Sequence, residues 1–172
     1  MRLTFTIIFN SLLFVSPLFA LAAQVAPPPN LGVKAYLLQD FNSGAQLAAS
    51  KKDERIEPAS LTKIMTAYLS FDALQHGHLK LDQTLPVSEK AWKVEGSKMF
   101  IDPKVAVTVD ELLHGMIIQS GNDASITLAI GVAGSEEQFA DMMNKQAAKL
   151  GMTGTHFMNA KIGRAHVWTP VT

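Results

Sequence analysis

The sequence predicts a mixed α/β (α+β) domain, and three observations support this fold class. Two short apolar runs, "VKAYLLQD" and "AQLAAS", flank turn-forming residues at 42–44, a pattern typical of an antiparallel hairpin. Helix-start signals pair Thr108 with Glu111 and Ser135 with Gln138, each before an apolar run. The 172 residues are 48% hydrophobic and 17% charged, a composition typical of one globular domain.

Charge and cysteine content exclude several classes of function. Fifteen basic residues balance fifteen acidic ones, so no charge excess indicates a nucleic-acid partner. The chain has no cysteine, which excludes disulfides, zinc–thiolate sites and thiol nucleophiles. His76 and His78 form a lone pair without an H-E-x-x-H motif, a pattern more often solvent-exposed than metal-binding. We therefore expect neither a metal nor another cofactor.

The N-terminus predicts export. Residues 1–22 combine Arg2, a mostly apolar run and small residues at Ala20 and Ala22, the pattern of a cleaved secretory signal peptide. A membrane anchor is the alternative, but polar residues and Pro17 interrupt the run, which is shorter than the ~20 apolar residues that a span needs. Residues 23–30 are typical of a proline-rich extended leader. The folded domain is expected from Leu31, in the periplasm.

A helix is predicted over "EPASLTKIMTAYLSFDAL", and its apolar residues fill one broad arc at ~100° per residue. Ser60 falls inside this arc and Lys63 at its edge, so the pattern predicts a helix that is buried nearly all round. A buried lysine is costly unless it is paired or neutral. Burial can lower a lysine pKa by up to ~3–5 from its usual ~10.4, and Lys63 could then act as a general base.

The spacing of the same two residues predicts a nucleophile beside its base. Positions i and i+3 lie on neighbouring turns, so Lys63 could reach the hydroxyl of Ser60. Pro58 suits the first turn, which puts Ser60 near a helix start where free N–H groups stabilise an oxyanion. An isolated S-x-x-K is more often a serine near a cap and a lysine snorkelling from a core helix.

A second polar element lies between two strongly apolar helical runs. In "GMIIQSGNDASITLAIGVAG", residues 120–122 are a turn-forming Ser-Gly-Asn set and predict a loop. Such residues can simply be a cap and a turn. A functional loop would instead present the Ser120 hydroxyl for proton relay and the Asn122 amide for a substrate carbonyl.

With these motifs the chain resembles the serine penicillin-recognising enzymes, through S-x-x-K as "SLTK" and S-x-N as "SGN". The order of "PASLTKIMTAYLSFDAL", "GSKMFI", "IIQSGNDASI" and "AAKLGMTGTHFMNA" is similar to D-alanyl-D-alanine carboxypeptidases of the penicillin-binding protein 5/6 type. The resemblance implies Ser60 as acylated nucleophile, Lys63 as proton acceptor, Ser120 as proton shuttle and Asn122 as substrate ligand. Residues 96–101 would border the same cleft.

The resemblance implies a β-lactamase/DD-peptidase-like transpeptidase fold, here represented by residues 31–160. The family's Lys-Thr-Gly motif, which lies on a strand beside the cleft, does not occur in the chain; Lys161 is followed by Ile162 and Gly163. We therefore expect an N-terminal fragment, truncated before that strand, that is inactive as a carboxypeptidase. The family's β-rich second domain and C-terminal membrane anchor are also expected to be missing.

The implied function is removal of the terminal D-alanine from peptidoglycan stem peptides, with β-lactam antibiotics as further ligands. The missing anchor would hold the full-length form on the periplasmic side of the inner membrane. Two alternatives remain open. A class A-like β-lactamase shares both motifs but needs a water-activating glutamate, for which the chain shows no candidate motif. A non-catalytic penicillin-binding module would keep the fold without turnover.

The final residues, 161–172, are expected not to be native protein. The resemblance ends at Ala160, and "KIGRAHVWTPVT" back-translates to a common sequencing-library adapter in which Trp168 corresponds to a TGA codon. A divergent native tail is the alternative, but an ordered match over this whole run is very improbable by chance.

Overall fold

The computed structural model describes residues 27–161. The predicted signal peptide at 1–22 lies outside these residues, as does the predicted tail beyond Lys161. Contacts divide the chain into two units, residues 1–32 and 33–172. In the first unit, the described prolines at 27–29 are exposed and belong to neither helix nor strand.

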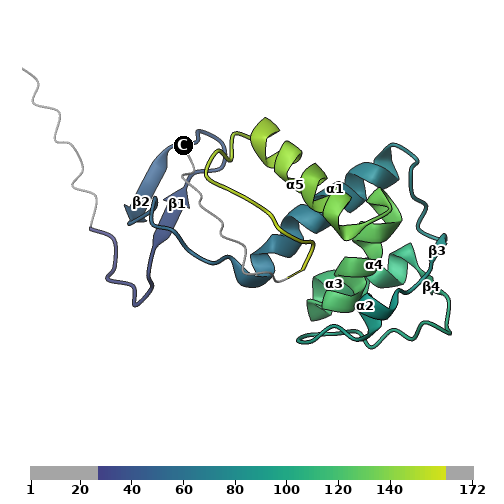
Figure 1. Ribbon diagram of the computed structural model, residues 1–172. Helices are drawn as coiled ribbons and strands as arrows, with labels where there is room; N and C mark the ends of the chain where they lie inside the picture. Colours follow the sequence, from purple (N-terminus) through teal and green to yellow (C-terminus); the bar gives the residue numbers. More distant parts are fainter. Residues whose placement is uncertain (1–26, 162–172) are drawn as a thin grey trace, which may run out of the picture. The chain divides into compact units, whose positions relative to one another are not determined.

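The second unit begins with the predicted hairpin (Figure 1). Strands β1 (Tyr36–Gln39) and β2 (Gln46–Ser50) pair antiparallel, with Tyr36 opposite Ser50. The turn is closed by the Asp40 carboxylate, which accepts hydrogen bonds from the backbone N–H and the hydroxyl of Ser43. Short polar side chains of this kind stabilise tight turns by bonding the nearby backbone.

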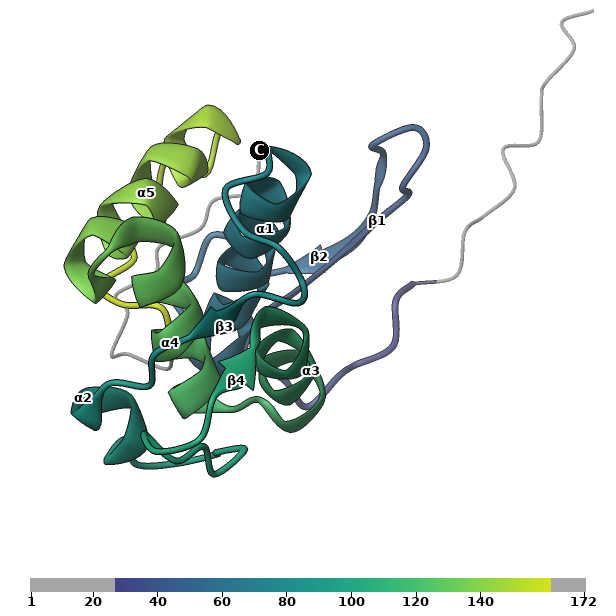
Figure 2. The ribbon, with the colours of Figure 1, turned by 90° about the vertical axis from the view of Figure 1, so that its right-hand side faces the viewer.

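The rest of the described chain contains helices, two short strands and the loops that connect them. In chain order they are the 3₁₀ turn η1 (Ala59–Leu61), α1 (Thr62–Gln75), β3 (Thr84–Leu85), α2 (Glu89–Trp92), β4 (Val107–Thr108), α3 (Val109–Gln119), α4 (Asn122–Ala133) and α5 (Glu136–Lys149). β3 and β4 pair antiparallel, and β4 leads directly into α3 (Figure 2). Within residues 27–161, no helix has the length and apolarity to cross a membrane.

Both predicted helix starts are confirmed. Thr108 and Glu111 form a complete capping box at α3, in which each side chain bonds the other residue's backbone N–H. At α5 the Ser135 hydroxyl accepts from the Gln138 N–H. Gly151, with φ +74°, follows the end of α5 as predicted.

Helix α4 is the centre of the helical core. It packs against α1, α2, α3 and α5 (Figure 2), and every residue from Asn122 to Ala129 is buried. One apolar cluster lies between α4 and α3, and another between α4, α5 and α1. The start of α4 is therefore held on several sides, which matters because the predicted Ser-Gly-Asn loop leads into it.

The prediction that α1 is buried nearly all round is wrong. Its apolar arc is largely exposed at Leu61, Ile64, Tyr68 and Phe71, and Ile64 retains 67% of its surface. The face with Thr62, Thr66 and Ser70 is buried instead. Two of these hydroxyls are satisfied by backbone groups: the Thr66 hydroxyl donates to the Ala160 carbonyl and the Ser70 hydroxyl to the Thr66 carbonyl.

Two phenylalanines allow a matched test of the core. Phe139 on α5 is fully buried, whereas Phe41 in the hairpin turn is 98% exposed. Phe139→Ala is expected to lower the free energy of unfolding by about 3–5 kcal/mol, because it removes buried apolar surface and leaves a cavity. Phe41→Ala is expected to change it by less than about 0.5 kcal/mol. Urea denaturation of both variants measures the difference, and equal effects would contradict this packing.

Candidate active site

Ser60 lies in a constrained turn immediately before α1. It occupies the 3₁₀ turn η1, where the Leu61 N–H donates to the Pro58 carbonyl at 2.9 Å. The preceding residue, Ala59, has φ +47°. An alanine gains nothing from this left-handed conformation, so the surrounding structure must hold it there. Pro58 caps η1, where the sequence had predicted it in the first helical turn, and Ser60 lies near the helix start as predicted.

Ser120 meets Ser60 across 60 residues of sequence. It ends α3 with φ +58°, another left-handed conformation at a residue other than glycine. From this position its hydroxyl donates to the Ser60 hydroxyl at an Oγ–Oγ distance of 3.0 Å. Strained backbone concentrates at functional sites. Ala59, next to Ser60, and Ser120 itself both have left-handed backbone, which favours a functional role for the two serines.

Lys63 is buried on α1 and 6% exposed. Its Nζ donates to Asn122 Oδ1 at 2.8 Å, at the start of α4. Within residues 27–161 no carboxylate lies within ion-pair distance of this amine, and no hydrogen bond joins it to Ser60. Burial lowers the pKa of Lys63. This shift favours the neutral form relative to an exposed lysine, and only the neutral amine has a lone pair that can accept a proton.

A pocket of about 490 Å³ opens onto these groups. Ser60, Lys63 and Ser120 supply polar atoms to its lining. The other lining residues are apolar: Pro58, Leu61, Ile64, Ala67, Met116 and Ile117. An apolar pocket with a few convergent polar groups is the usual form of a small-ligand site.

Asn122 has a different place from the one its predicted role suggests. It is 4% exposed, and it lies behind Lys63 without lining the pocket. Its Oδ1 accepts from Lys63, and its Nδ2 donates to the Glu95 carbonyl at 2.8 Å. Its role as a substrate ligand stays a prediction, whereas its contact with Lys63 is part of the structure.

His76, His78 and His114 lie away from this arrangement. His76 and His78 are exposed after α1, and His76 Nδ1 contacts the Asp72 carbonyl. His114 is also exposed, with Nδ1 against the Asp110 carbonyl. Across the part of the chain that the structure describes, no group of three or more His, Asp and Glu could hold a metal ion.

Two contributors to the site were not predicted from the sequence. One is Asp123, which is 1% exposed and accepts hydrogen bonds from the backbone N–H groups of Met99 and Ile101. The other is the Glu95 carbonyl on Asn122. A carboxylate directly after Ser-Gly-Asn in an apolar run was a possible signal for Asp123. A backbone carbonyl leaves no signal in the sequence.

Solved structures with a similar fold are penicillin-recognising peptidases. D-alanyl-D-alanine carboxypeptidase DacD from Francisella tularensis matches with a TM-score of 0.77 and 38% identity, over 81% of this chain and 34% of that one. Penicillin binding protein 5 from Haemophilus influenzae matches with a TM-score of 0.76 and 37% identity, over 84% of this chain and 41% of that one. The fold is therefore the β-lactamase/DD-peptidase-like fold that the sequence predicted.

The sequence identifies the family within this class. The chain is 45% identical over 151 residues to D-alanyl-D-alanine carboxypeptidase DacC of Escherichia coli strain K12, a match that covers 84% of this chain and 38% of that protein. Residues 22–163 match Peptidase S11, the D-alanyl-D-alanine carboxypeptidase family. The chain belongs to this family, as its motifs indicated, and it spans about two fifths of the length of DacC.

The surroundings of Lys63 predict how its amine titrates. We expect the Nζ of Lys63 to titrate below the ordinary lysine value of ~10.4, because burial disfavours the charged form. The unfolded chain then binds more protons than the folded chain, so stability rises with pH between the lowered and the ordinary pKa. NMR titration of lysine side chains, assigned with Lys63→Arg, measures the value. A Lys63 pKa of ~10.4 or above would contradict this expectation.

Proposed function

We propose that the protein carrying this chain is a serine D-Ala-D-Ala carboxypeptidase that acts through an acyl-enzyme on Ser60. The observation that carries the proposal is the meeting of two hydroxyls and one buried amine at a single pocket. Ser120 donates to Ser60 at 3.0 Å, and Lys63 lines the same pocket. A nucleophile, a proton acceptor and a proton relay are the groups that acyl transfer needs.

In the acylation step, Ser60 Oγ attacks the carbonyl carbon of the peptide bond that precedes the terminal D-alanine. Because Ser60 accepts a hydrogen bond from Ser120, its own proton is free to pass to the lone pair of neutral Lys63. Backbone N–H groups near the start of η1 that make no intrahelical hydrogen bond would stabilise the oxyanion. The intermediate then collapses to an ester on Ser60.

The same groups complete the cycle. The C–N bond to the terminal residue breaks, and the proton held by Lys63 passes through the Ser120 hydroxyl to the leaving amine of D-alanine. Water then attacks the ester, giving a shortened peptide with a new carboxylate and restoring the Ser60 hydroxyl. Asn122 can contribute through its second Nδ2 proton, which makes no hydrogen bond to residues 27–161 and could meet a substrate carbonyl.

Penicillins present a reactive amide to the same nucleophile and would form the same ester. The Haemophilus relative is named as a penicillin binding protein, which supports β-lactams as ligands of this chain's full-length protein. The substrate would then be the peptidoglycan stem peptide, and the protein would act where that substrate lies, in the periplasm. We also propose that the full-length protein carries a C-terminal segment that anchors it to the inner membrane.

The first test removes the nucleophile. Ser60→Ala in the full-length protein is expected to abolish covalent labelling by fluorescent penicillin, because the acyl bond needs that oxygen. Ser50→Ala, a control at an exposed serine on β2, is expected to label as the wild type does. Gel fluorescence and intact mass measure the adduct. Labelling of Ser60→Ala at the control level would remove Ser60 as the nucleophile.

The second test concerns the base. Lys63→Arg is expected to lose acylation, because a guanidinium stays protonated and cannot accept the Ser60 proton. The measurement is the labelling rate under the same conditions, with circular dichroism to show that the variant is folded. A folded Lys63→Arg protein that acylates at the wild-type rate would show that Lys63 is not the base.

A further inference from the structure

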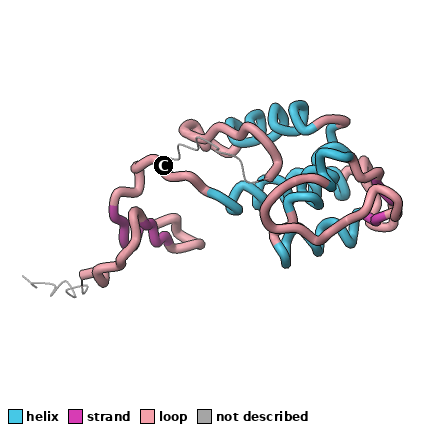
Figure 3. The backbone as a smooth tube through the Cα atoms, turned by 60° about the horizontal axis from the view of Figure 1, so that its bottom comes forward, coloured by secondary structure: helices cyan, strands magenta, loops and turns pink. Residues whose placement is uncertain are grey.

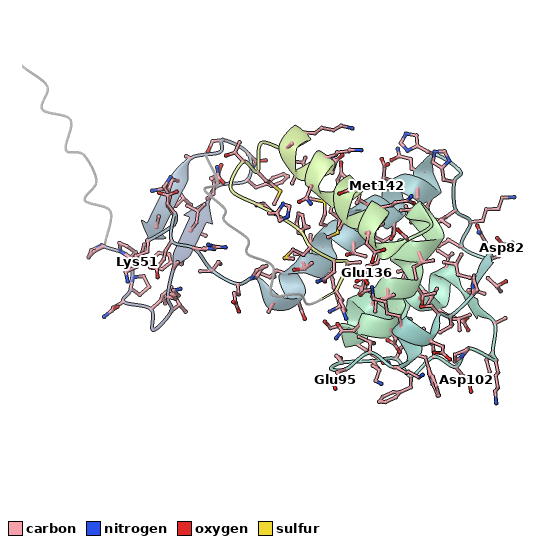
Figure 4. All side chains as sticks on the ribbon, viewed as in Figure 1. Lys51, Asp82, Glu95, Asp102, Glu136 and Met142 are labelled. Atoms are coloured by element: carbon pink, nitrogen blue, oxygen red, sulfur yellow. The ribbon has the colours of Figure 1, made fainter. Side chains whose placement is uncertain are left out.

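The loop segment at residues 95–101 lies against the start of α4. It belongs to the long connection between α2 and β4, which Figure 3 shows as loop. In Figure 4 the labelled Glu95 is its first residue, and the labelled Asp102 directly follows its last. The Asn122 N–H donates to the Ser97 carbonyl at 2.7 Å, and the Ser97 hydroxyl donates to the Gln119 carbonyl. Hydrogen bonds therefore hold the segment to residues on both sides of Ser120, Gln119 and Asn122.

The Glu95 carbonyl decides which way the Asn122 amide points. A carbonyl oxygen can only accept hydrogen bonds, so the atom of Asn122 that lies 2.8 Å from it must be Nδ2. Oδ1 is then turned toward Lys63, where it accepts from Nζ at 2.8 Å. If the amide were reversed, Nδ2 would donate to Lys63 and occupy the lone pair that the base needs.

Gly96 makes this approach possible. Its φ of +88° is a conformation that residues with a side chain rarely adopt. A Cβ at this position would lie 2.8 Å from Asn122 Nδ2, closer than real Cβ contacts allow. Any side chain at residue 96 must therefore move either the Glu95 carbonyl or the Asn122 amide away from the other.

Asp123 holds the other end of the segment through hydrogen bonds. Its carboxylate accepts from the N–H groups of Met99 at 3.0 Å and Ile101 at 3.3 Å, and from the Ala124 N–H at 2.9 Å. These three N–H groups are all satisfied only if both terminal atoms of the residue 123 side chain accept hydrogen bonds, as the two carboxylate oxygens of Asp123 do. An asparagine of the same shape would turn an N–H₂ group toward at least one of them.

We propose that Gly96 and Asp123 are positioning residues of the acylation site, because they hold the Glu95 carbonyl against Asn122 and so turn its oxygen toward Lys63. The effect on acylation rests on the proposed function, whereas the effect on Lys63 does not. Neither residue touches the substrate pocket. Both act through the orientation of a single side-chain amide.

The test compares Gly96→Ala with Gly77→Ala. Gly77 also has a positive φ, +73°, but no atom lies within 4 Å of its Cβ position, so it reproduces the backbone strain without the contact. In Gly96→Ala the amine loses its oxygen partner, so its pKa, followed by NMR, should fall below the Gly77→Ala value. Penicillin acylation of the full-length protein should slow by about 10²-fold, the usual effect of such a misplacement.

Asp123→Asn provides a second variant that adds no bulk. It should lower the Lys63 pKa and the acylation rate, each by less than Gly96→Ala does. If Gly96→Ala does not fold, Asp123→Asn is the variant that decides the test. A folded Gly96→Ala protein whose Lys63 pKa or acylation rate equals that of Gly77→Ala would overturn the inference. If the wild-type protein takes no label, the proposed function fails, and the Lys63 pKa values alone decide the inference.

Discussion

The burial of one amine against one neutral amide is the constraint on which the site depends. Lys63 lies 6% exposed on α1, and its hydrogen bond goes to Asn122 Oδ1. A carboxylate in place of this amide would keep the amine charged and end its use as a base. The neutral partner lets burial lower the pKa while still satisfying one N–H of the amine.

Several features of the fold follow from placing that amide. Asn122 begins α4, the helix that packs against four others, so its backbone is fixed by the core. Ser120 is held two residues earlier in a left-handed conformation that ends α3 and turns its hydroxyl to Ser60. Strain at Ser120 and Ala59 is thus offset by packing elsewhere and gives a pre-arranged pair of hydroxyls.

The local chemistry of the sequence predicted the parts of the fold that depend on local contacts. The hairpin turn and the Thr108 capping box are formed by side chains within a few residues of each other, so the sequence showed their patterns directly. The meeting of Ser60 with Ser120 was implied by the family resemblance, because no periodicity relates residues that far apart. The helical wheel predicted α1 to be buried nearly all round, which is wrong because a wheel cannot show which apolar positions stay uncovered. Ile64 is exposed, whereas Thr66 is buried because a backbone carbonyl satisfies its hydroxyl. The Glu95 carbonyl could not be predicted because any residue supplies one.

The pH dependence of the acylation rate constant with penicillin, measured on the full-length protein, tests the role of Lys63 most directly. We expect the rate to rise with pH through a single group whose pKa matches that of Lys63 by NMR and lies below ~10.4. A rate that does not change with pH across the Lys63 titration would contradict this role, because a neutral Lys63 would then not be required for attack by Ser60.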